Sequence, residues 1–127
     1  MMPTSAEMKA VMTKYASLVS AGDAEAVVAL YADNATIEDP VGSPAQSGRE
    51  AIAKFYQGAC ASGVKINVLS GPYGSFGNSA AMVAEVLVEV PGLGPSRIEL
   101  VEVMEFDAQG KISAMRAYWG QEDMKPV

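Results

Sequence analysis

Glu102 is the residue whose placement points most directly to chemistry. In the strand-like stretch 98–106, every second residue from Ile98 to Phe106 is apolar except Glu102, whereas the residues between them mix charges with valines. Side chains of a strand point alternately to its two faces, so this pattern directs Glu102 inward. Burial penalises the ionised form and raises a carboxyl pKa by up to about 3–5 units, which would leave a protonated hydrogen-bond donor at neutral pH. A bulge or a shifted register is the alternative, since either would turn the side chain outward.

Asp39 shows the same placement in a second, shorter stretch. Ile37, Asp39 and Val41 share one face of a strand predicted over residues 36–41. Pro40 favours an extended Asp39, because proline disfavours helical conformations of the residue before it. An Asp-Pro pair is also typical of a turn, so this pattern leaves a structural and a catalytic role open.

Three tyrosines occupy apolar stripes of predicted helices. Tyr15 belongs to the first helix, Tyr31 to the second and Tyr56 to the third. A core tyrosine is ordinarily structural and bonds its hydroxyl to some partner. Three phenols that face one core could form a hydrogen-bonded chain, which would make Tyr15 a better donor.

A carboxylate, a phenol and a protonated carboxyl in apolar surroundings suit proton abstraction beside a carbonyl group. The carboxylate takes the proton, and the neutral donors stabilise the enolate oxygen. The chain has no histidine, which excludes Ser–His and Cys–His nucleophile pairs and histidine-based metal sites. Glycoside hydrolysis also uses two carboxylates, but it ordinarily takes place in an open polar cleft. The sequence therefore predicts acid–base chemistry with no metal and no cofactor.

Helical periodicity comes first along the chain, and strand periodicity follows. Thr4 and Glu7 form a capping-box pattern before the first helix, and Ser47 and Glu50 form another before the third. The second helix is expected over residues 24–32. The other expected elements are strands at 64–68, 82–90, 98–106 and 111–119, a glycine-rich turn at 71–77 and a loop at 91–95. This order predicts an α+β fold with three N-terminal helices packed on a curved, mostly antiparallel sheet.

The bulk composition limits the partners of the chain. Its 127 residues are expected to form one domain, 1–127. The formal net charge of −6 argues against nucleic acid, and no apolar run is long enough to cross a membrane. One cysteine, Cys60, and a polar N-terminal stretch with Glu7 predict a cytoplasmic protein.

Several stretches of the chain resemble the bacterial ketosteroid isomerases (steroid Delta-isomerases), a family within the cone-shaped α+β proteins called nuclear transport factor 2-like. The most specific are Glu-Asp-Pro-Val-Gly at 38–42 and the spacing from Tyr15 to Asp39. Further matches lie at 12–15, 21–23, 30–37, 47–50, 55–56, 101–106 and 115–119. The resemblance covers nearly the whole chain and implies a cone with a deep apolar pocket, a hydrophobic steroid substrate and a homodimer.

The resemblance also implies roles for individual residues. Asp39 corresponds to the general base and Tyr15 to the main oxyanion donor of the family. Tyr31 and Tyr56 correspond to tyrosines that support this phenol. Glu102 stands where the family has an aspartic acid as second donor, so its arm is one methylene longer. The residues that correspond to the lining of the steroid pocket are Val19, Phe55, Met115 and Trp119.

Other functions on the same fold stay open at this point. A cyclase or an epoxide hydrolase would use further polar residues or a charged network that positions water. A binding protein for a hydrophobic ligand would keep the apolar cone without needing Asp39 in place. A purely structural dimerisation module is a further alternative. The co-occurrence of Tyr15, Asp39 and an inward carboxyl favours an isomerase over the last two.

Overall fold

The computed structural model describes residues 2–127. It contains three α-helices, seven strands and one short 3-10 helix in these residues. The helices are α1 (Ser5–Ser20), α2 (Ala24–Val28), α3 (Arg49–Ala61) and the 3-10 helix η1 (Gln121–Asp123). The strands are β1 (Tyr31–Glu38), β2 (Gln46–Ser47), β3 (Lys65–Tyr73), β4 (Ser79–Val90), β5 (Gly94–Phe106), β6 (Ile112–Tyr118) and β7 (Met124–Pro126).

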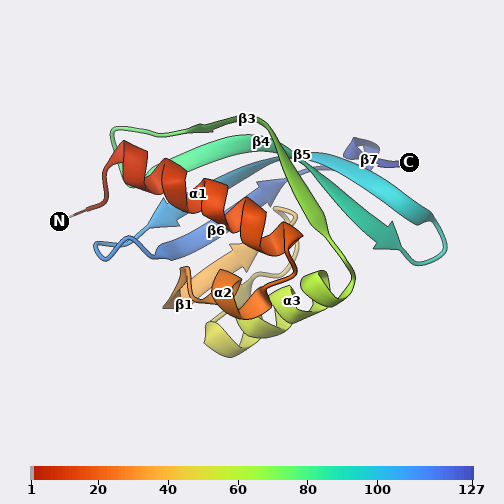
Figure 1. The fold of residues 1–127 in the computed structure, drawn as a ribbon, viewed down its shortest axis with the longest axis horizontal. Helices are drawn as coiled ribbons and strands as arrows, with labels where there is room; N and C mark the ends of the chain where they lie inside the picture. Colours follow the sequence, from red (N-terminus) through yellow and green to blue (C-terminus); the bar gives the residue numbers. More distant parts are fainter. Residues whose placement is uncertain (1) are drawn as a thin grey trace.

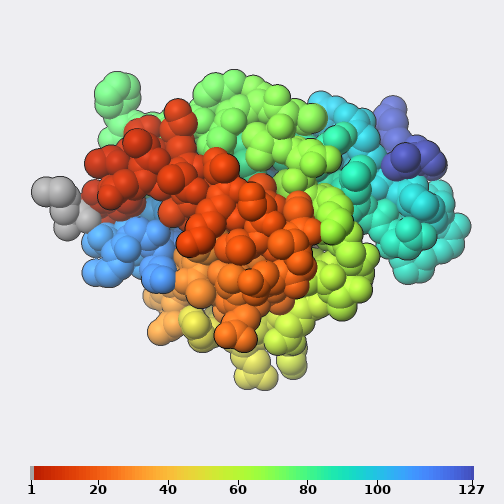
Figure 2. Space-filling model, in the orientation of Figure 1, coloured from red at the N-terminus to blue at the C-terminus, as the bar shows by residue number. Residues whose placement is uncertain are grey.

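The strands form one curved sheet in the order β2-β1-β6-β5-β4-β3, and β7 pairs with β5. Every strand pair is antiparallel except β1 with β6. The helices lie on one side of this sheet, with α1 along β3 and β4 and α3 against β1 and β2 (Figure 1). The β4–β5 hairpin extends past the helices at one end of the molecule (Figure 2). The predicted α+β class, with helices on a mostly antiparallel sheet, is confirmed.

The start of α1 follows the predicted capping box. The Thr4 hydroxyl accepts the Glu7 amide, and the Glu7 carboxylate accepts the Thr4 amide. The capping box predicted for the third helix is wrong. The N-cap of α3 is Gly48, whose φ of +89° suits glycine, and no side chain caps it. Ser47 belongs to β2 instead, because it pairs with Thr36 of β1.

The predicted second helix is too long. It was expected to include Tyr31, but α2 ends at Val28 and Tyr31 is the first residue of β1. Tyr31 pairs with Ile112 of β6, and the Ile112 amide donates to the Leu30 carbonyl. Sheet pairing with a strand far along the chain therefore overrides local helix propensity.

The predicted alternation of residues 98–106 is confirmed. Ile98, Leu100, Glu102, Met104 and Phe106 are all buried, and they face the helices together with the buried residues of the neighbouring strands. The strand itself is longer than predicted, since β5 already begins at Gly94. Likewise β3 continues into the first part of the predicted glycine-rich turn, to Tyr73.

Candidate active site

Most of the functional residues predicted from the sequence converge on a cavity of about 220 Å³ between the sheet and helices α1 and α3. Tyr15 and Val19 reach it from α1, and Phe55, Tyr56 and Ala59 reach it from α3. Asp39, Glu102 and Trp119 contribute from the sheet side. The rest of the wall is aliphatic: Val64, Ile66, Val86, Val88, Ile98 and Leu100. The polar groups are few, and apolar surface surrounds them.

Asp39 directly follows β1 and is half-buried. Burial raises the pKa of its carboxyl above the ordinary value, and a hydrogen bond from Trp119 opposes that rise. The indole Nε1 of Trp119 donates to Asp39 Oδ1 at 2.9 Å. Next to Asp39 the chain is also held to β6, because the Val41 amide donates to the Ala117 carbonyl at 2.8 Å. The carboxylate is thus oriented by the end of β6.

Glu102 lies in the middle of β5 with 2% of its surface exposed. Neither carboxyl oxygen has a hydrogen-bond partner among the described residues. The pKa of Glu102 is raised to about 8, mainly by burial and further by the negative charge of Asp39, while the nearby Tyr15 hydroxyl opposes the rise. At neutral pH Glu102 therefore carries a proton with no protein acceptor, in a cavity that a ligand can enter.

The hydroxyls of three buried tyrosines form a chain that ends at the cavity. Tyr56 donates to Tyr15 at 3.0 Å, and the Tyr31 and Tyr56 hydroxyls are hydrogen-bonded to each other. Each hydroxyl has one proton, so Tyr31 donates to Tyr56, and the proton of Tyr15 is left for a cavity ligand. Burial raises the pKa of all three phenols well above the ordinary value, so all three are neutral donors.

The structure brings together Tyr15, Asp39, Glu102, Tyr56, Val19, Phe55 and Trp119 around this one cavity. Tyr31 lies behind the wall and reaches it through Tyr56. Met115 does not line the cavity; it is buried in the core on β6, paired with Ile37 and Met104 of the adjacent strands. The sequence analysis identified Trp119 as a wall residue and missed its bond to Asp39. No spacing signal joins residues 80 positions apart.

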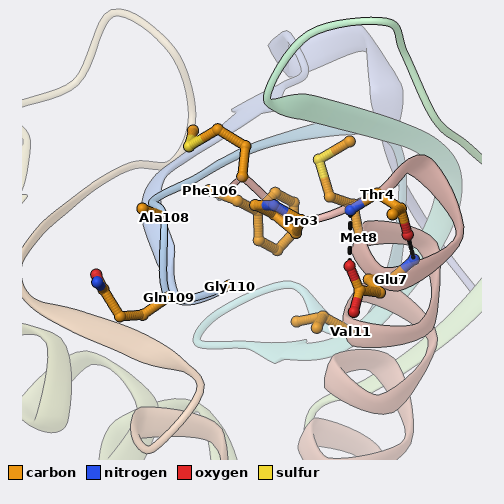
Figure 3. A pocket seen from close by; sticks show the side chains of 10 residues that line it. Pro3, Thr4, Glu7, Met8, Val11, Phe106, Ala108, Gln109 and Gly110 are labelled. Atoms are coloured by element: carbon orange, nitrogen blue, oxygen red, sulfur yellow. Dashed lines mark hydrogen bonds between the residues drawn. The ribbon is translucent and has the colours of Figure 1, made fainter.

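A second hollow, of about 380 Å³, lies between the start of α1 and the β5–β6 turn (Figure 3). Its one carboxylate, Glu7, is already engaged with the Thr4 amide. Phe106, Val11 and Met8 form apolar parts of its wall (Figure 3). This hollow has no facing pair of proton carriers, so the acid–base chemistry belongs to the Asp39 cavity.

Residues 2–127 contain no group of three or more His, Cys, Asp or Glu side chains arranged to hold a metal ion. None of the helices within that range is long and apolar enough to cross a membrane.

The Asp39 cavity holds two carboxyl groups that favour different protonation states. Asp39 accepts a hydrogen bond that favours its ionised form, whereas Glu102 makes no hydrogen bond among the described residues, and its raised pKa keeps it protonated near neutral pH. With the Tyr15 phenol, the set provides one proton acceptor and two neutral donors in a cavity with mostly apolar walls. Such a set can move a proton on a bound molecule while holding a developing negative charge on an oxygen.

The known proteins to which this chain is similar include enzymes. Residues 12–115 match the SnoaL-like domain family. The steroid Delta-isomerase of Nocardioides simplex is 41% identical over 120 residues, which cover 94% of this chain and 95% of that protein. The epoxide hydrolase LasB of Streptomyces lasalocidi is 33% identical over 126 residues, which cover 96% of this chain and 44% of LasB.

Among solved structures, the epoxide hydrolase/cyclase-like enzyme SalBIII, described with a role in pyran ring formation in the polyether salinomycin, has the same fold. The TM-score is 0.83 at 29% identity, and the match covers 94% of this chain and 95% of SalBIII. The SnoaL-like match and the similarity to the steroid Delta-isomerase over nearly its full length agree with the motifs at 38–42 and 101–106. The chain therefore belongs to the ketosteroid isomerase family within the SnoaL-like, nuclear transport factor 2-like proteins.

Proposed function

We propose that this protein is a steroid Delta-isomerase, which converts 3-oxo-Δ5-steroids into conjugated 3-oxo-Δ4-steroids without a cofactor. One observation carries the proposal: a carboxylate with a hydrogen-bond donor and a protonated carboxyl without an acceptor line the same apolar cavity. The identity of 41% to a steroid Delta-isomerase supports the choice of substrate.

In this mechanism Asp39 removes a proton from carbon 4, which lies between the ketone and the alkene. The electrons of the broken C–H bond move into a dienolate, and its oxygen accepts hydrogen bonds from Tyr15 and Glu102. Asp39 then returns the same proton to carbon 6, and the double bond comes into conjugation with the ketone. Asp39 both removes and returns the proton, so the reaction needs no co-reactant.

The tyrosine chain explains how a neutral phenol can be an effective donor. As negative charge develops on the substrate oxygen, Tyr15 strengthens its bond to that oxygen. The bond from Tyr56 to Tyr15, backed by Tyr31, stabilises the charge that Tyr15 gains. The aliphatic walls exclude water, which makes these bonds stronger than they would be in solvent.

The first experiment mixes the purified protein with 5-androstene-3,17-dione and follows the ultraviolet absorbance of the conjugated enone. Wild type should produce the enone rapidly, and Asp39→Asn should lose nearly all turnover. Wild type that binds the steroid without converting it would point to a binding protein. Neither binding nor turnover would show that the steroid assignment is wrong.

A second candidate is acid–base opening of an epoxide, favoured by the protonated state of Glu102 and by the similarity to LasB and SalBIII. Glu102 would give its proton to the epoxide oxygen while Asp39 takes a proton from the attacking water or hydroxyl. One C–O bond breaks and another forms, so the reaction needs no redox partner.

A single substrate panel separates the two candidates. Apolar epoxides, with and without an internal hydroxyl, are incubated with the protein, and mass spectrometry and chromatography detect a diol or a cyclic ether. Isomerase activity with no epoxide opening supports the first candidate, and the reverse result supports the second. The isomerisation needs Glu102 only as a hydrogen-bond donor, whereas epoxide opening needs its full proton transfer. Glu102→Gln should therefore retain part of an isomerase activity and abolish an epoxide-opening activity.

We also propose that two copies associate through the sheet face that the helices leave uncovered. Val101 and Tyr118 are paired neighbours on β5 and β6, with 39% and 46% of their surfaces exposed. Sedimentation velocity should give a dimer, and Val101→Glu should shift it towards monomer, because a carboxylate in an apolar interface is costly.

A further inference from the structure

Strand β6 ends at Tyr118, directly before Trp119, whose indole bonds Asp39. β6 pairs with β5 up to Tyr118, and pairing resumes at Met124 of β7, opposite Ile98. Between them the chain forms a short turn over residues 119–123, which includes η1. Trp119, whose indole bonds Asp39, is the first residue of this turn.

Asp123 closes the turn by a reciprocal pair of bonds. Its carboxylate Oδ2 accepts the Gly120 amide at 2.7 Å, and its own amide donates to the Gly120 carbonyl at 3.0 Å. Asp123 is half-buried, and the neighbouring Glu122 carboxylate lies against Gly120. The segment that follows the turn is fixed to the start of β5 as well, because the Val127 amide donates to the Pro95 carbonyl at 2.9 Å.

The Gly120 amide belongs to the planar peptide unit that begins at the Trp119 carbonyl. Because this unit is rigid, a bond that fixes the direction of the Gly120 N–H also fixes the backbone rotation at Trp119. That rotation helps to set where the indole ring points. A carboxylate at position 123 therefore restricts the backbone rotation at Trp119, and the allowed rotamers of the indole depend on that rotation.

We propose that Asp123 is a positioning residue for Asp39, acting through the Gly120 peptide and the Trp119 indole. Asp123 itself does not line the cavity. Its effect on the reaction rests on the proposed function, whereas its effect on the Trp119–Asp39 bond does not. The ionisable groups that share the cavity with this bond are Glu102, Tyr15 and Tyr56, and Glu122 lies beside the turn.

The chain offers a direct probe of this bond, because Trp119 is its one tryptophan. The protein labelled with 15N has a single indole N–H signal, and its position as a function of pH follows the ionisation of the acceptor carboxylate. The Asp39→Asn variant identifies the Asp39 transition, since it should abolish this step.

Asp123→Ala should move the Asp39 transition of the indole signal to higher pH, because the bond that favours the ionised form is weakened. It should also lower kcat/KM between about threefold and tenfold, in line with the loss of one modest hydrogen bond. Asp123→Asn keeps an acceptor oxygen for the Gly120 amide and should restore both readouts.

Asp107 provides a matched control at the other end of the β5–β6 hairpin. Its carboxylate accepts the Gln109 and Lys111 amides at 2.9 and 3.0 Å, so it closes a turn in a similar way but far along the strands from Trp119. Asp107→Ala should leave the indole transition and kcat/KM unchanged.

If Asp123→Ala does not fold, Asp123→Glu displaces the carboxylate by one methylene and should move the indole transition in the same direction. An indole transition that stays at the wild-type pH in folded Asp123→Ala or Asp123→Glu would overturn the proposal. A wild type that lacks isomerase activity but shows the expected indole shifts would refute the isomerase assignment and leave the role of Asp123 intact.

Discussion

The indole Nε1 of Trp119 donates a 2.9 Å hydrogen bond to Oδ1 of Asp39, although the two residues are 80 positions apart. The bond joins the ends of β1 and β6, the one parallel pair in the sheet. It lowers the pKa of Asp39 against the larger rise caused by burial, so it favours the ionised form that can accept a proton.

Replacing Trp119 with Phe should therefore shift the acid limb of the pH profile. The pKa of Asp39 rises when its donor is lost, so kcat/KM should begin to increase only at higher pH than in wild type. Near neutral pH the loss should be roughly tenfold, in the range of one hydrogen bond to a charged group. Phe55→Leu is the control: it changes another cavity wall and should leave the acid limb in place.

Glu102 should set the alkaline limb. Its pKa is raised to about 8, first by burial and then by the charge of Asp39, so above that pH it ionises and no longer donates. We expect kcat/KM of wild type to fall above about pH 8. Glu102→Gln keeps an N–H donor that does not ionise, and its profile should stay flat to higher pH. An unchanged alkaline limb in the Gln variant would assign the limb to another group.

The same shift predicts that Glu102 destabilises the fold as pH rises. Below about pH 4.5 the carboxyl is protonated in both the folded and the unfolded chain and contributes no pH dependence. Between that pH and about 8 the unfolded chain ionises while the folded chain stays protonated, so the free energy of unfolding falls with rising pH. The contribution is on the order of 5 kcal/mol. Urea denaturation should show that the free energy of unfolding of Glu102→Gln exceeds that of wild type by an amount that grows with rising pH. A difference that does not change with pH would contradict the raised pKa of Glu102.

Removing hydroxyls along the series Tyr15, Tyr56 and Tyr31 should give losses that decrease with each bond away from Tyr15. Tyr15→Phe removes the donor that contacts the developing oxyanion and should lower kcat by about 10²–10³-fold. Tyr56→Phe removes the bond to Tyr15 and should cost roughly tenfold, with a smaller loss for Tyr31→Phe. Thermal unfolding of the three variants separates lost catalysis from lost folding. Equal losses of kcat for all three variants would show that the three tyrosines act only through packing.

The alternation along 98–106 predicted the burial of Glu102 correctly, because a strand with one face in the core restricts register strongly. The same kind of local reasoning failed for Tyr31. Its neighbours have helical spacing, but the residue belongs to β1 because Ile112, far along the chain, pairs with it. Met115 shows a similar limit: its strand was predicted, yet its side chain is buried in the core and does not line the cavity.

By itself the sequence determined the α+β class, the inward carboxyl at position 102, the absence of histidine chemistry and the identity of the three phenols. These follow from residue type and from period, which are local properties. Tertiary structure alone decided that Tyr56 bonds Tyr15, that Trp119 bonds Asp39 and that Glu102 has no hydrogen-bond partner within residues 2–127. Each of these depends on the distance between side chains from different elements, and that distance is set by how the sheet curves and where the helices pack against it.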